Sequence, residues 1–563
     1  MTWYFAELAR YKAEREGLAA LERRADWCTI VGMRTDSELR IIYDVDIAVG
    51  TNTYEAYLQY PAHFPHTPPS VFPRDGSSRW SGHQFGAGGE LCLEYGPDTW
   101  TSDLTGVDVL ESTYRLLSGE YPAPDQSATV ASRHKTSLGQ SLRGEWQRVL
   151  ITRNTADFLA DVPEGVALSG TFAVGWRYPG AIYSFYKITQ PDGAVWQDAS
   201  YPEHLAFEVS EIPFAMVRLS KETKLPSLEV EEFMARCASL GIPAEAFYVV
   251  LLRGSKTHAY WLQSDGSGVK QMGIVPAQPE DRRLSQDHDA LKSKSVALVG
   301  CGSLGSKIGT MLARAGVGRF VLFDDDILLP DNLVRHDLDW RDVGSHKGQA
   351  LARRLEFVNP ATKVRTRQLQ LTGQESSGSA ETALNMLTEC DLIIDATANP
   401  DAFNLIAAVA SSAKKSVLWA EVFGGGIGGL IARSRPGIEP NPQLARRSIE
   451  NWFHEQGAPP VRTTRGYGAG SPAAPMIADD ADVSAIAAPT ARLAIDTLIE
   501  RNPSLFPHSA YAIGLAPGSV FTQPFDTRPI ELGEPEPDQL EDTLSDDERR
   551  EELKTLIGLF VKK

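Results

Sequence analysis

The chain of 563 residues is too long for a single hydrophobic core and predicts about three or four domains. Its formal net charge of -18 argues against nucleic acid as a partner, and no stretch approaches the roughly 18 apolar residues of a membrane span. The charged N-terminus is no secretory signal, and five cysteines without a CxxC pair indicate neither a zinc site nor a disulfide framework, so we expect a cytoplasmic protein.

Residues 1–150 predict an α+β domain that begins with a helix and continues with strands. Apolar side chains alternate with polar or small ones in segments 41–49 and 54–58, which is the period of a half-buried strand. A Pro-rich turn, YPAHFPHTPPSVFP, and a loop around Cys92 follow. The next apolar residues have helical spacing: Val107, Leu110, Tyr114 and Leu117.

The order of these landmarks over residues 54–117 resembles the core of ubiquitin-conjugating (E2, UBC-like) enzymes. That family has a Pro-rich turn, a His-Pro-Asn segment, a cysteine in an xCLx context, a Trp and a helix. The resemblance implies that Cys92 forms the thioester, and a thiol is the most nucleophilic side chain near neutral pH. The sequence departs at His83, Gln84 and Phe85, where the family's Asn is absent. Gln84 or backbone N–H groups are the candidates to replace that Asn.

Three further regions follow the first domain. Residues 151–285 predict a mixed α/β domain with strand-like segments around the helix-like LEVEEFMARCASLG, and they carry no recognisable chemistry. Residues 286–520 alternate short apolar strands with helices, the rhythm of a parallel, doubly wound sheet. Residues 521–563 form an acidic C-terminal tail that closes with the helical pattern DDERREELKTLIGLFVKK.

A glycine turn opens the third domain, in VALVGCGSLGSKIGTMLARAG. Its glycines let the backbone approach a phosphate chain at a helix N-terminus, where free N–H groups favour anions: Gly300, Gly302 and Gly305. Alone, this pattern also fits a tight turn in an empty Rossmann-like unit. Asp324 ends the next strand, where a carboxylate can accept from ribose hydroxyls. Asn332, Arg335 and Lys347 follow, and an amide with two cations suits a triphosphate better than a dinucleotide.

This stretch resembles the ThiF/MoeB-like E1 superfamily in the order GxGxxGS, strand-ending acid, NLxR and Lys after a VG turn. The resemblance implies a Rossmann-like adenylation domain that uses ATP and Mg²⁺, commonly as a homodimer. Asp324 would then hold the ribose, and Asn332, Arg335 and Lys347 would contact the phosphates. The family's magnesium-binding acid is replaced by Ala398 in DATANPD, so Asp395 is our candidate ligand, with a helix-capping role as the alternative.

No cysteine follows Cys390, although E1 enzymes that feed an E2 usually carry their own. Ser471 stands where the thiol is expected. The chain as a whole resembles bacterial E2–E1 fusion proteins of ubiquitination-like (Bub/Bil/Cap2-like) pathways, some of which use a serine oxyester and some of which serve anti-phage defence. A highly activated acyl-adenylate makes a serine acceptor chemically tolerable. Direct transfer to Cys92, with Ser471 as a plain loop hydroxyl, is the alternative.

The resulting hypothesis is an enzyme that adenylates the C-terminus of a ubiquitin-like protein and passes it, through Ser471 or directly, to Cys92 and then to a target lysine or other amine. One alternative is a sulfur-carrier adenylyltransferase without conjugation, which needs no E2 core. Another is a non-enzymatic scaffold with two decayed sites, favoured by Phe85 and Ala398.

Overall fold

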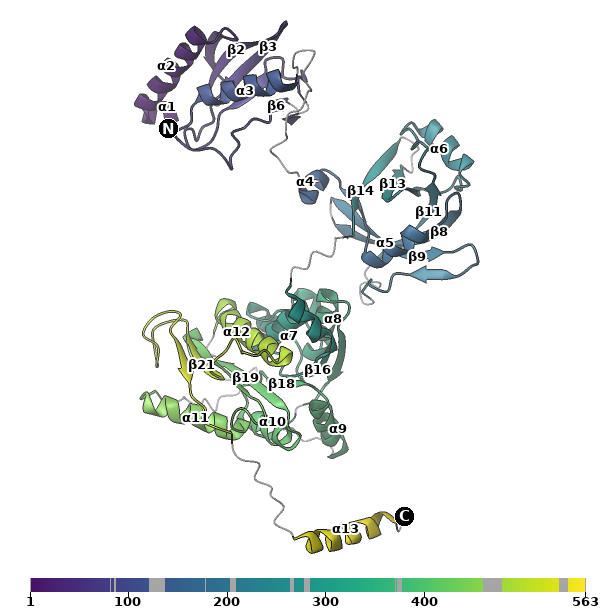
Figure 1. Ribbon diagram of the computed structural model, residues 1–563, viewed down its shortest axis with the longest axis vertical. Helices are drawn as coiled ribbons and strands as arrows, with labels where there is room; N and C mark the ends of the chain where they lie inside the picture. The colour runs from purple at the N-terminus through teal and green to yellow at the C-terminus, as the bar shows by residue number, and fades with distance from the viewer. Residues whose placement is uncertain are drawn as a thin grey trace. The chain divides into compact units, whose positions relative to one another are not determined.

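The computed structural model forms two compact units, Met1–Ser141 and Leu142–Lys563, and each is treated by itself (Figure 1). None of the described helices is both long and apolar enough to cross a membrane. The described residues are 2–81, 83–85, 88–120, 137–177, 179–202, 209–263, 268–277, 284–369, 371, 377–458, 478–535 and 545–561.

The N-terminal unit packs two helices on one face of a four-stranded antiparallel sheet of order β1-β2-β3-β4. Its helices are α1 (Trp3–Ala6), α2 (Leu8–Arg24) and α3 (Gly106–Glu120), and α4 (Leu138–Leu142) spans the division between the two units. Its strands are β1 (Cys28–Thr35), β2 (Ile41–Val49), β3 (Asn52–Gln59), β4 (Ser70–Pro73) and the short pair β5 (Gln84–Phe85) and β6 (Glu90–Leu91). Alternate residues of β2 and β3 are buried against α2 and α3, as their period of two predicts.

A buried carboxylate joins three parts of this unit. Glu14 of α2 is 1% exposed, and its Oε2 accepts hydrogen bonds from the Tyr60 hydroxyl and the Gly106 N–H, both at 2.8 Å. Arg10 forms an ion pair with Glu14 at 3.0 Å. Because Gly106 begins α3, this cluster fixes where the segment after Cys92 ends.

The middle of the chain forms a mostly β body in which the sheet closes on itself. Its order is β10-β9-β7-β14-β13-β12-β11-β8, and β8 also pairs with β9. The strands are β7 (Gln147–Leu150), β8 (Ala167–Arg177), β9 (Gly180–Thr189), β10 (Val195–Gln197), β11 (Ser210–Leu219), β12 (Tyr248–Arg253), β13 (Lys256–Leu262) and β14 (Val269–Val275). The helices are α5 (Arg153–Asp161) and α6 (Val230–Ser239). Seven strands therefore form a barrel that leaves few edges exposed.

The division between the first two regions lies earlier than the expected position at residue 150. The N-terminal unit ends at Ser141, and β7 (Gln147–Leu150) pairs in parallel with β9 and β14 of the barrel. The sequence of a four-residue strand is too short to predict which strands it pairs with, because its partners lie far along the chain.

The last body is a three-layer α/β structure around a sheet of order β17-β16-β15-β18-β19-β20-β21-β22. The first five of these strands are parallel and the last three are antiparallel. The strands are β15 (Ser295–Val299), β16 (Arg319–Phe323), β17 (Lys363–Arg367), β18 (Leu392–Asp395), β19 (Ser416–Val422), β20 (Gly428–Ser434), β21 (Ala510–Gly514) and β22 (Thr527–Ile530). The chain reverses direction along the sheet beside β15, which makes the carboxyl end of β15 the topological switch point.

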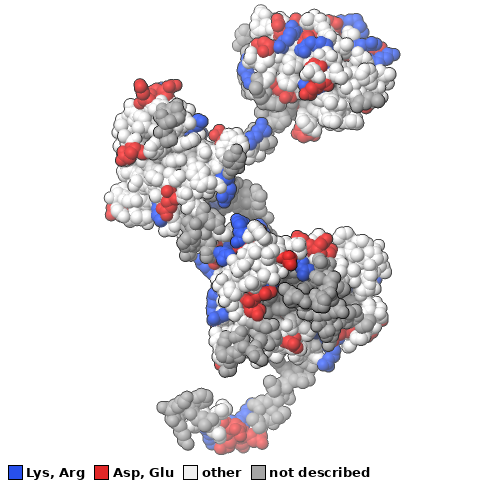
Figure 2. Space-filling view, turned by 180° about the vertical axis from the view of Figure 1, so that it is seen from behind, with Lys and Arg blue, Asp and Glu red and all other residues white. Residues whose placement is uncertain are grey.

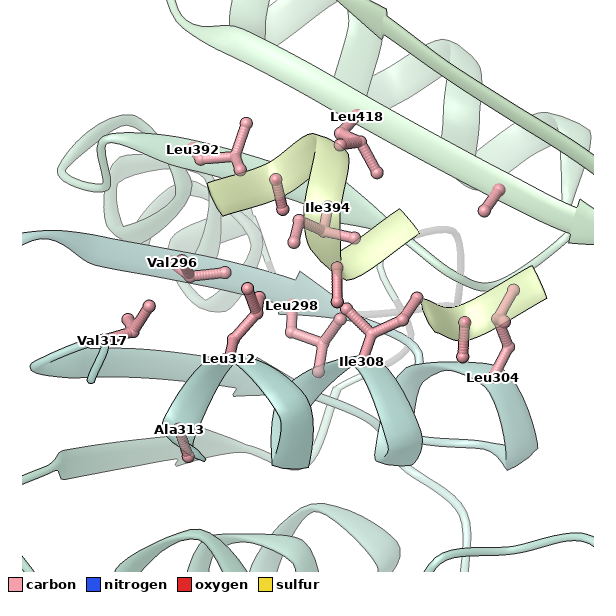
Figure 3. Close-up of a cluster of buried hydrophobic side chains, with 14 of the residues drawn as sticks. Val296, Leu298, Leu304, Ile308, Leu312, Ala313, Val317, Leu392, Ile394 and Leu418 are labelled. Carbon is pink, nitrogen blue, oxygen red and sulfur yellow. The ribbon is translucent and has the colours of Figure 1, made fainter. Parts of the chain in front are cut away.

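Helices cover both faces of this sheet (Figure 1). One layer contains α7 (Ser303–Ala315), α8 (Lys347–Val358) and α12 (Asp480–Ile499), and the other contains α9 (Ser377–Thr388), α10 (Pro400–Ser412) and α11 (Pro442–Glu455). The 3-10 helices are η2 (Gln286–Ser293), η3 (Pro330–Val334), η4 (Trp340–Asp342) and η5 (Gly424–Gly426). Figure 3 shows Ile308 and Leu312 of α7 against Leu298 of β15, in the core that holds α7 under the strand.

The sheet continues past residue 520, where the acidic tail was expected to begin. Phe521 and Leu532 are buried, and β22 pairs with β21 at the edge of the sheet. Pro529 is compatible with an edge strand because it has no N–H to donate. The final helix α13 (Asp546–Val561) forms where the closing helical pattern predicted it.

Candidate functional site

The glycine turn connects β15 to α7, and two of its three glycines leave little or no room for a side chain. Gly300 has a φ of +87°, and a Cβ there would lie 3.1 Å from the Ala396 carbonyl. A Cβ on Gly305 would lie 1.9 Å from the Gly300 carbonyl oxygen. Gly302 is the N-cap of α7, and a Cβ there would meet nothing within 4 Å. The turn is therefore tight on its protein side and open beside Gly302, where a ligand can approach the free N–H groups of α7.

The carboxylate of Asp324 lies directly against this turn. It follows β16, and its Oδ2 accepts from the Cys301 N–H at 2.7 Å while its Oδ1 accepts from the Asp326 N–H at 2.9 Å. Burial raises the pKa of the Asp324 carboxyl, and the hydrogen bonds from Cys301 and Asp326 oppose that rise. The structure thus brings the predicted ribose-binding acid next to the predicted phosphate-binding turn.

Lys347 is the first residue of α8 and lies close to Asp324. Its Nζ contacts Asp326 Oδ2 at 2.5 Å, and its side chain is 11% exposed. Its charge lowers the pKa of both the Asp324 carboxyl and the Cys301 thiol, although burial raises both pKa values more strongly. A cation therefore lies beside the glycine turn and the Asp324 carboxylate, balanced by the carboxylate of Asp326.

Asn332 and Arg335 lie on the segment that begins with η3. Asn332 Oδ1 accepts from the Leu329 N–H at 2.9 Å and so shapes this short helix. Arg335 Nη1 donates to the Ala478 carbonyl at 3.4 Å, a long bond that links the segment to the start of α12. Asn332 is thus held within its own short helix, whereas Arg335 contacts a residue far along the chain.

Two residues that the sequence analysis did not single out also support this site. His336 is 6% exposed and bonds through Nε2 to the Cys301 carbonyl at 2.8 Å. Lys307 of α7 has a side chain only 7% exposed and pairs with Asp480 of α12 at 2.6 Å. Because both side chains are polar, the sequence did not indicate that they are buried. The one sequence feature that could have pointed to His336 is its position directly after Arg335.

Asp395, the candidate magnesium ligand, is a nearly buried carboxylate at the end of β18. It is 4% exposed, and its Oδ1 accepts from the N–H and the hydroxyl of Thr397 at 2.9 and 2.6 Å. Burial raises the pKa of Asp395 and of Glu421, and the Asp395 charge adds to the rise at Glu421. Ala398 has a φ of +52°, a left-handed conformation that costs a residue with a Cβ about 1–2 kcal/mol.

The described residues contain no group of three or more His, Cys, Asp or Glu side chains suited to hold a metal. Magnesium commonly takes one or two carboxylates and completes its shell with water and substrate phosphates. Asp395 fits that limited role as a single carboxylate, so a magnesium ion here would depend on nucleotide oxygens for its other ligands.

The N-terminal unit holds Cys92 just after β6, at the start of residues 92–105, here named the Cys92 loop. The Cys92 N–H donates to the carbonyl of His83, the residue before β5, at 2.7 Å. The Glu94 N–H donates to the Ser112 hydroxyl of α3 at 3.0 Å, and Trp100 Nε1 donates to the Pro65 carbonyl at 2.7 Å. The loop is thus fixed on three sides while Cys92 stays half-buried.

Gln84 organises the backbone in front of Cys92. Its Oε1 accepts from the N–H groups of Trp80 and Ser81 at 2.6 and 3.1 Å. Its Nε2 donates to the carbonyls of Gly89 and Ser78 at 2.7 and 3.3 Å. Both amide hydrogens are therefore occupied, and the side chain acts here as a scaffold for the turn.

Burial raises the pKa of the Cys92 thiol above its ordinary value of 9.0, and the charge of Glu90 adds to the rise. The thiol is therefore not activated by a local cation or base among the groups that shift its pKa. The other four cysteines, Cys28, Cys237, Cys301 and Cys390, are buried, as expected for packing residues. Ser471, the candidate acyl acceptor, lies outside the described residues.

The visible face in Figure 2 shows Lys and Arg interspersed with Asp and Glu. Among the residues coloured there, neither sign covers a large continuous area. On that face the charges are arranged as on an ordinary solvated protein surface.

Comparison with known proteins identifies the last body. Residues 280–441 match the ThiF family, so the chain contains a ThiF, E1-like domain that includes the glycine turn, Asp324, Asn332, Arg335 and Lys347. The chain is 34% identical over 138 residues to the ATP-dependent ubiquitin transferase-like protein Cap2 of Pseudomonas aeruginosa, a match that covers 23% of each protein.

The chain is also 30% identical over 219 residues to ubiquitin-like modifier-activating enzyme 5 of Drosophila willistoni, covering 35% of this chain and 53% of that protein. The chain thus spans about a quarter to a half of the length of these curated relatives. Among solved structures, Escherichia coli MccB with ATP aligns with a TM-score of 0.35 at 19% identity, over 44% of this chain and 67% of that one.

Proposed function

We propose that the chain activates the C-terminal carboxylate of a ubiquitin-like protein with ATP and transfers it, through Ser471 or directly, to Cys92 and then to a target amine. The observation that carries the proposal is the meeting of the glycine turn, Asp324 and Lys347 at the switch point of a sheet whose residues match the ThiF family. The relatives named as ubiquitin transferase-like and ubiquitin-like modifier-activating proteins support the choice of substrate class.

In the first step, a carboxylate oxygen of the partner attacks the α-phosphorus of ATP, the bond from that phosphorus to the bridging oxygen breaks, and pyrophosphate leaves. The N–H groups at the start of α7 would receive the phosphates, and Asp324 would accept from the ribose hydroxyls. Lys347 and Arg335 would neutralise charge that develops on the transferring phosphate, after exchanging their present oxygen partners for phosphate oxygens. Magnesium, held by the nucleotide and Asp395, would screen the charge on the leaving pyrophosphate.

In the second step, the acyl-adenylate passes to a nucleophile and releases AMP. Capture by Ser471 would form an oxyester and release the hydroxyl proton, and transfer to Cys92 would exchange that ester, or the adenylate itself, for a thioester. Because the Cys92 pKa is raised, the thiol must lose its proton as it attacks. A target amine then forms an amide and regenerates the thiol. The proposal includes a homodimer, which analytical ultracentrifugation of the full chain would test.

Exchange of radiolabelled pyrophosphate into ATP tests the first step. The full chain should catalyse exchange only when a ubiquitin-like protein with a free C-terminal glycine, chosen from the source genome, is added. The same partner without its last residue is the control. A chain that neither binds ATP nor exchanges pyrophosphate with any such partner would refute the proposal and favour the scaffold alternative.

The adduct chemistry separates the two transfer routes. An adduct that resists thiols, is cleaved by alkali and disappears in Ser471→Ala would establish the oxyester. An adduct that reductant cleaves and that Ser471→Ala leaves unchanged would assign the transfer to Cys92 alone. Exchange without any adduct would favour the sulfur-carrier alternative.

A further inference from the structure

His336 occupies a buried position between the two halves of the candidate nucleotide site. It directly follows Arg335, and its side chain reaches back to the carbonyl of Cys301 in the glycine turn at 2.8 Å. Its own N–H donates to the Asn332 carbonyl at 3.0 Å. The residue therefore connects the segment that carries Asn332 and Arg335 with the turn that begins α7.

The hydrogen bonds define one form of the imidazole ring. A carbonyl oxygen only accepts, so Nε2 must carry the proton that it shares with Cys301. The Leu338 N–H donates to Nδ1 at 3.2 Å, so Nδ1 must be unprotonated. Both ring nitrogens are thus used, and the ring is neutral with its hydrogen on Nε2.

The backbone of Cys301 is held from two sides. Its N–H, in the peptide that follows Gly300, donates to Asp324 Oδ2 at 2.7 Å, and its carbonyl, in the peptide that precedes Gly302, accepts from His336. The two bonds thus orient the two peptide groups that flank Cys301, and the bond from His336 orients the peptide that leads into α7. Removal of the His336 bond would free that peptide to rotate, because Gly302 restricts it little.

We propose that His336 is a positioning residue, which fixes the glycine turn relative to Arg335 so that both can contact the same triphosphate. The proposal rests on the function proposed above and deepens it. In this role His336 acts on the nucleotide site through the Cys301 carbonyl and through the chain link to Arg335.

The charged groups around the ring make its neutral form sensitive to acid. Burial lowers the pKa of His336 below its ordinary value of 6.5. Lys347 of α8 and Lys307 of α7 lower that pKa further, while Asp337 on its own segment and the bond to Cys301 oppose them. Protonation at low pH would place a hydrogen on Nδ1 facing the Leu338 N–H, and the ring would have to leave its position.

Substitution by the two amides separates the contacts. In His336→Gln the amide nitrogen can replace Nε2 and keep the bond to Cys301, whereas in His336→Asn the amide oxygen can replace only Nδ1. We expect His336→Ala and His336→Asn to raise the KM for ATP in pyrophosphate exchange by about 10-fold or more, from the loss of a buried hydrogen bond. His336→Gln should stay within about threefold of the wild-type KM, with kcat changed less than KM in all three. His288→Gln, in η2 of the same unit and bonded to Ser285, is the matched control and should change nothing.

The pH profile supplies a readout that a purely structural role would not move. ATP affinity of the wild-type chain should hold near neutral pH and fall as the pH decreases below 6.5, because burial lowers the pKa of His336 below that value. In His336→Gln, ATP affinity should fall less over the same pH range, because the decrease caused by protonation of the imidazole is removed. An identical profile in wild type and His336→Gln would overturn the proposal.

Hydrogen exchange without nucleotide distinguishes this inference from the proposed function. Peptides covering residues 300–306 should exchange faster in His336→Ala and His336→Asn than in wild type or His336→Gln. If that holds while the wild-type chain fails to use ATP, the positioning contact stands and the adenylation proposal fails. If His336→Asn matches wild type in both exchange and KM, or if His336→Gln is the poorer variant, the proposal is wrong. Should His336→Ala not fold, the Gln and Asn pair alone decides.

Discussion

The candidate nucleotide site and the Cys92 loop differ in how their reactive side chains are surrounded. At the nucleotide site, residues from the ends of β15 and β16 and from the start of α8 lie beside the glycine turn, and both cations considered for the phosphates already contact protein oxygens. At the Cys92 loop, the described polar contacts hold the backbone around the cysteine, and burial raises the pKa of the thiol. The first site thus holds charged side chains beside a helix N-terminus, whereas the second holds a thiol whose pKa is raised by burial and by Glu90.

This difference suggests that the two proposed sites have different roles in the transfer. A thiol with a raised pKa reacts slowly with unactivated carboxyl groups, but an acyl-adenylate or ester is a far better electrophile. The driving force for transfer would therefore come from ATP at the first site, and the second site would supply a nucleophile held in place. Five substitutions would break or sharpen that comparison.

The largest effect is expected from Cys92→Ala, which should abolish the reductant-sensitive adduct while pyrophosphate exchange continues at the wild-type rate. The thiol is the proposed acceptor, and its unit forms its own core apart from the ThiF domain. Non-reducing gels of the adduct and the exchange assay measure the two effects. Cys237→Ala, a buried residue of the barrel, is the control. A full adduct yield in Cys92→Ala would remove Cys92 from the scheme.

Lys347→Met and Arg335→Met should each lower kcat/KM of pyrophosphate exchange by about 100- to 1,000-fold, or roughly 2.7–4 kcal/mol of lost charge stabilisation. Lys363→Met, an exposed lysine of β17, is the matched control and should retain activity. Differential scanning fluorimetry would verify that the variants stay folded. Near-normal exchange in both variants would show that the cations of this site serve the fold alone.

Gln84→Ala should slow transfer to Cys92 by about 10-fold, because two carbonyls (Gly89 and Ser78) and two N–H groups (Trp80 and Ser81) lose their hydrogen-bond partners and the turn before the cysteine loosens. Hydrogen exchange around residues 88–94 should rise in parallel. An oxyanion role for Gln84 predicts slower transfer with unchanged hydrogen exchange, so the two measurements distinguish scaffold from catalyst.

The smallest effect is expected from Glu90→Gln, which removes a charge that raises the Cys92 pKa. The rate of Cys92 alkylation by iodoacetamide should increase with pH and reach half its maximum above pH 9.0 in wild type. In Glu90→Gln the midpoint should shift to lower pH, with a modest gain in rate near neutrality. Glu55→Gln, on the exposed side of β3, provides a control for surface charge. A wild-type midpoint near neutral pH would indicate an activated thiol and contradict the comparison.

Much of the candidate nucleotide site could be predicted because its parts are local. The strand, turn and helix around Gly300 follow one another directly, and Asp324 ends the next strand, so the parallel sheet had to bring both to one edge. The position of Cys92 before a helix could also be predicted. The burial of His336 and Lys307 could not, because it depends on partners that lie far along the chain.

The amino-acid sequence by itself determined the order of strands and helices in the last body, the glycine turn and the landmarks around Cys92, because periodicity and turn chemistry are properties of neighbouring residues. Only the tertiary structure decided that the middle strands close into a barrel, that β7 and β22 join sheets beyond the expected boundaries, and that Gln84 is a scaffold. Each of these depends on hydrogen bonds between residues whose pairing no local pattern specifies.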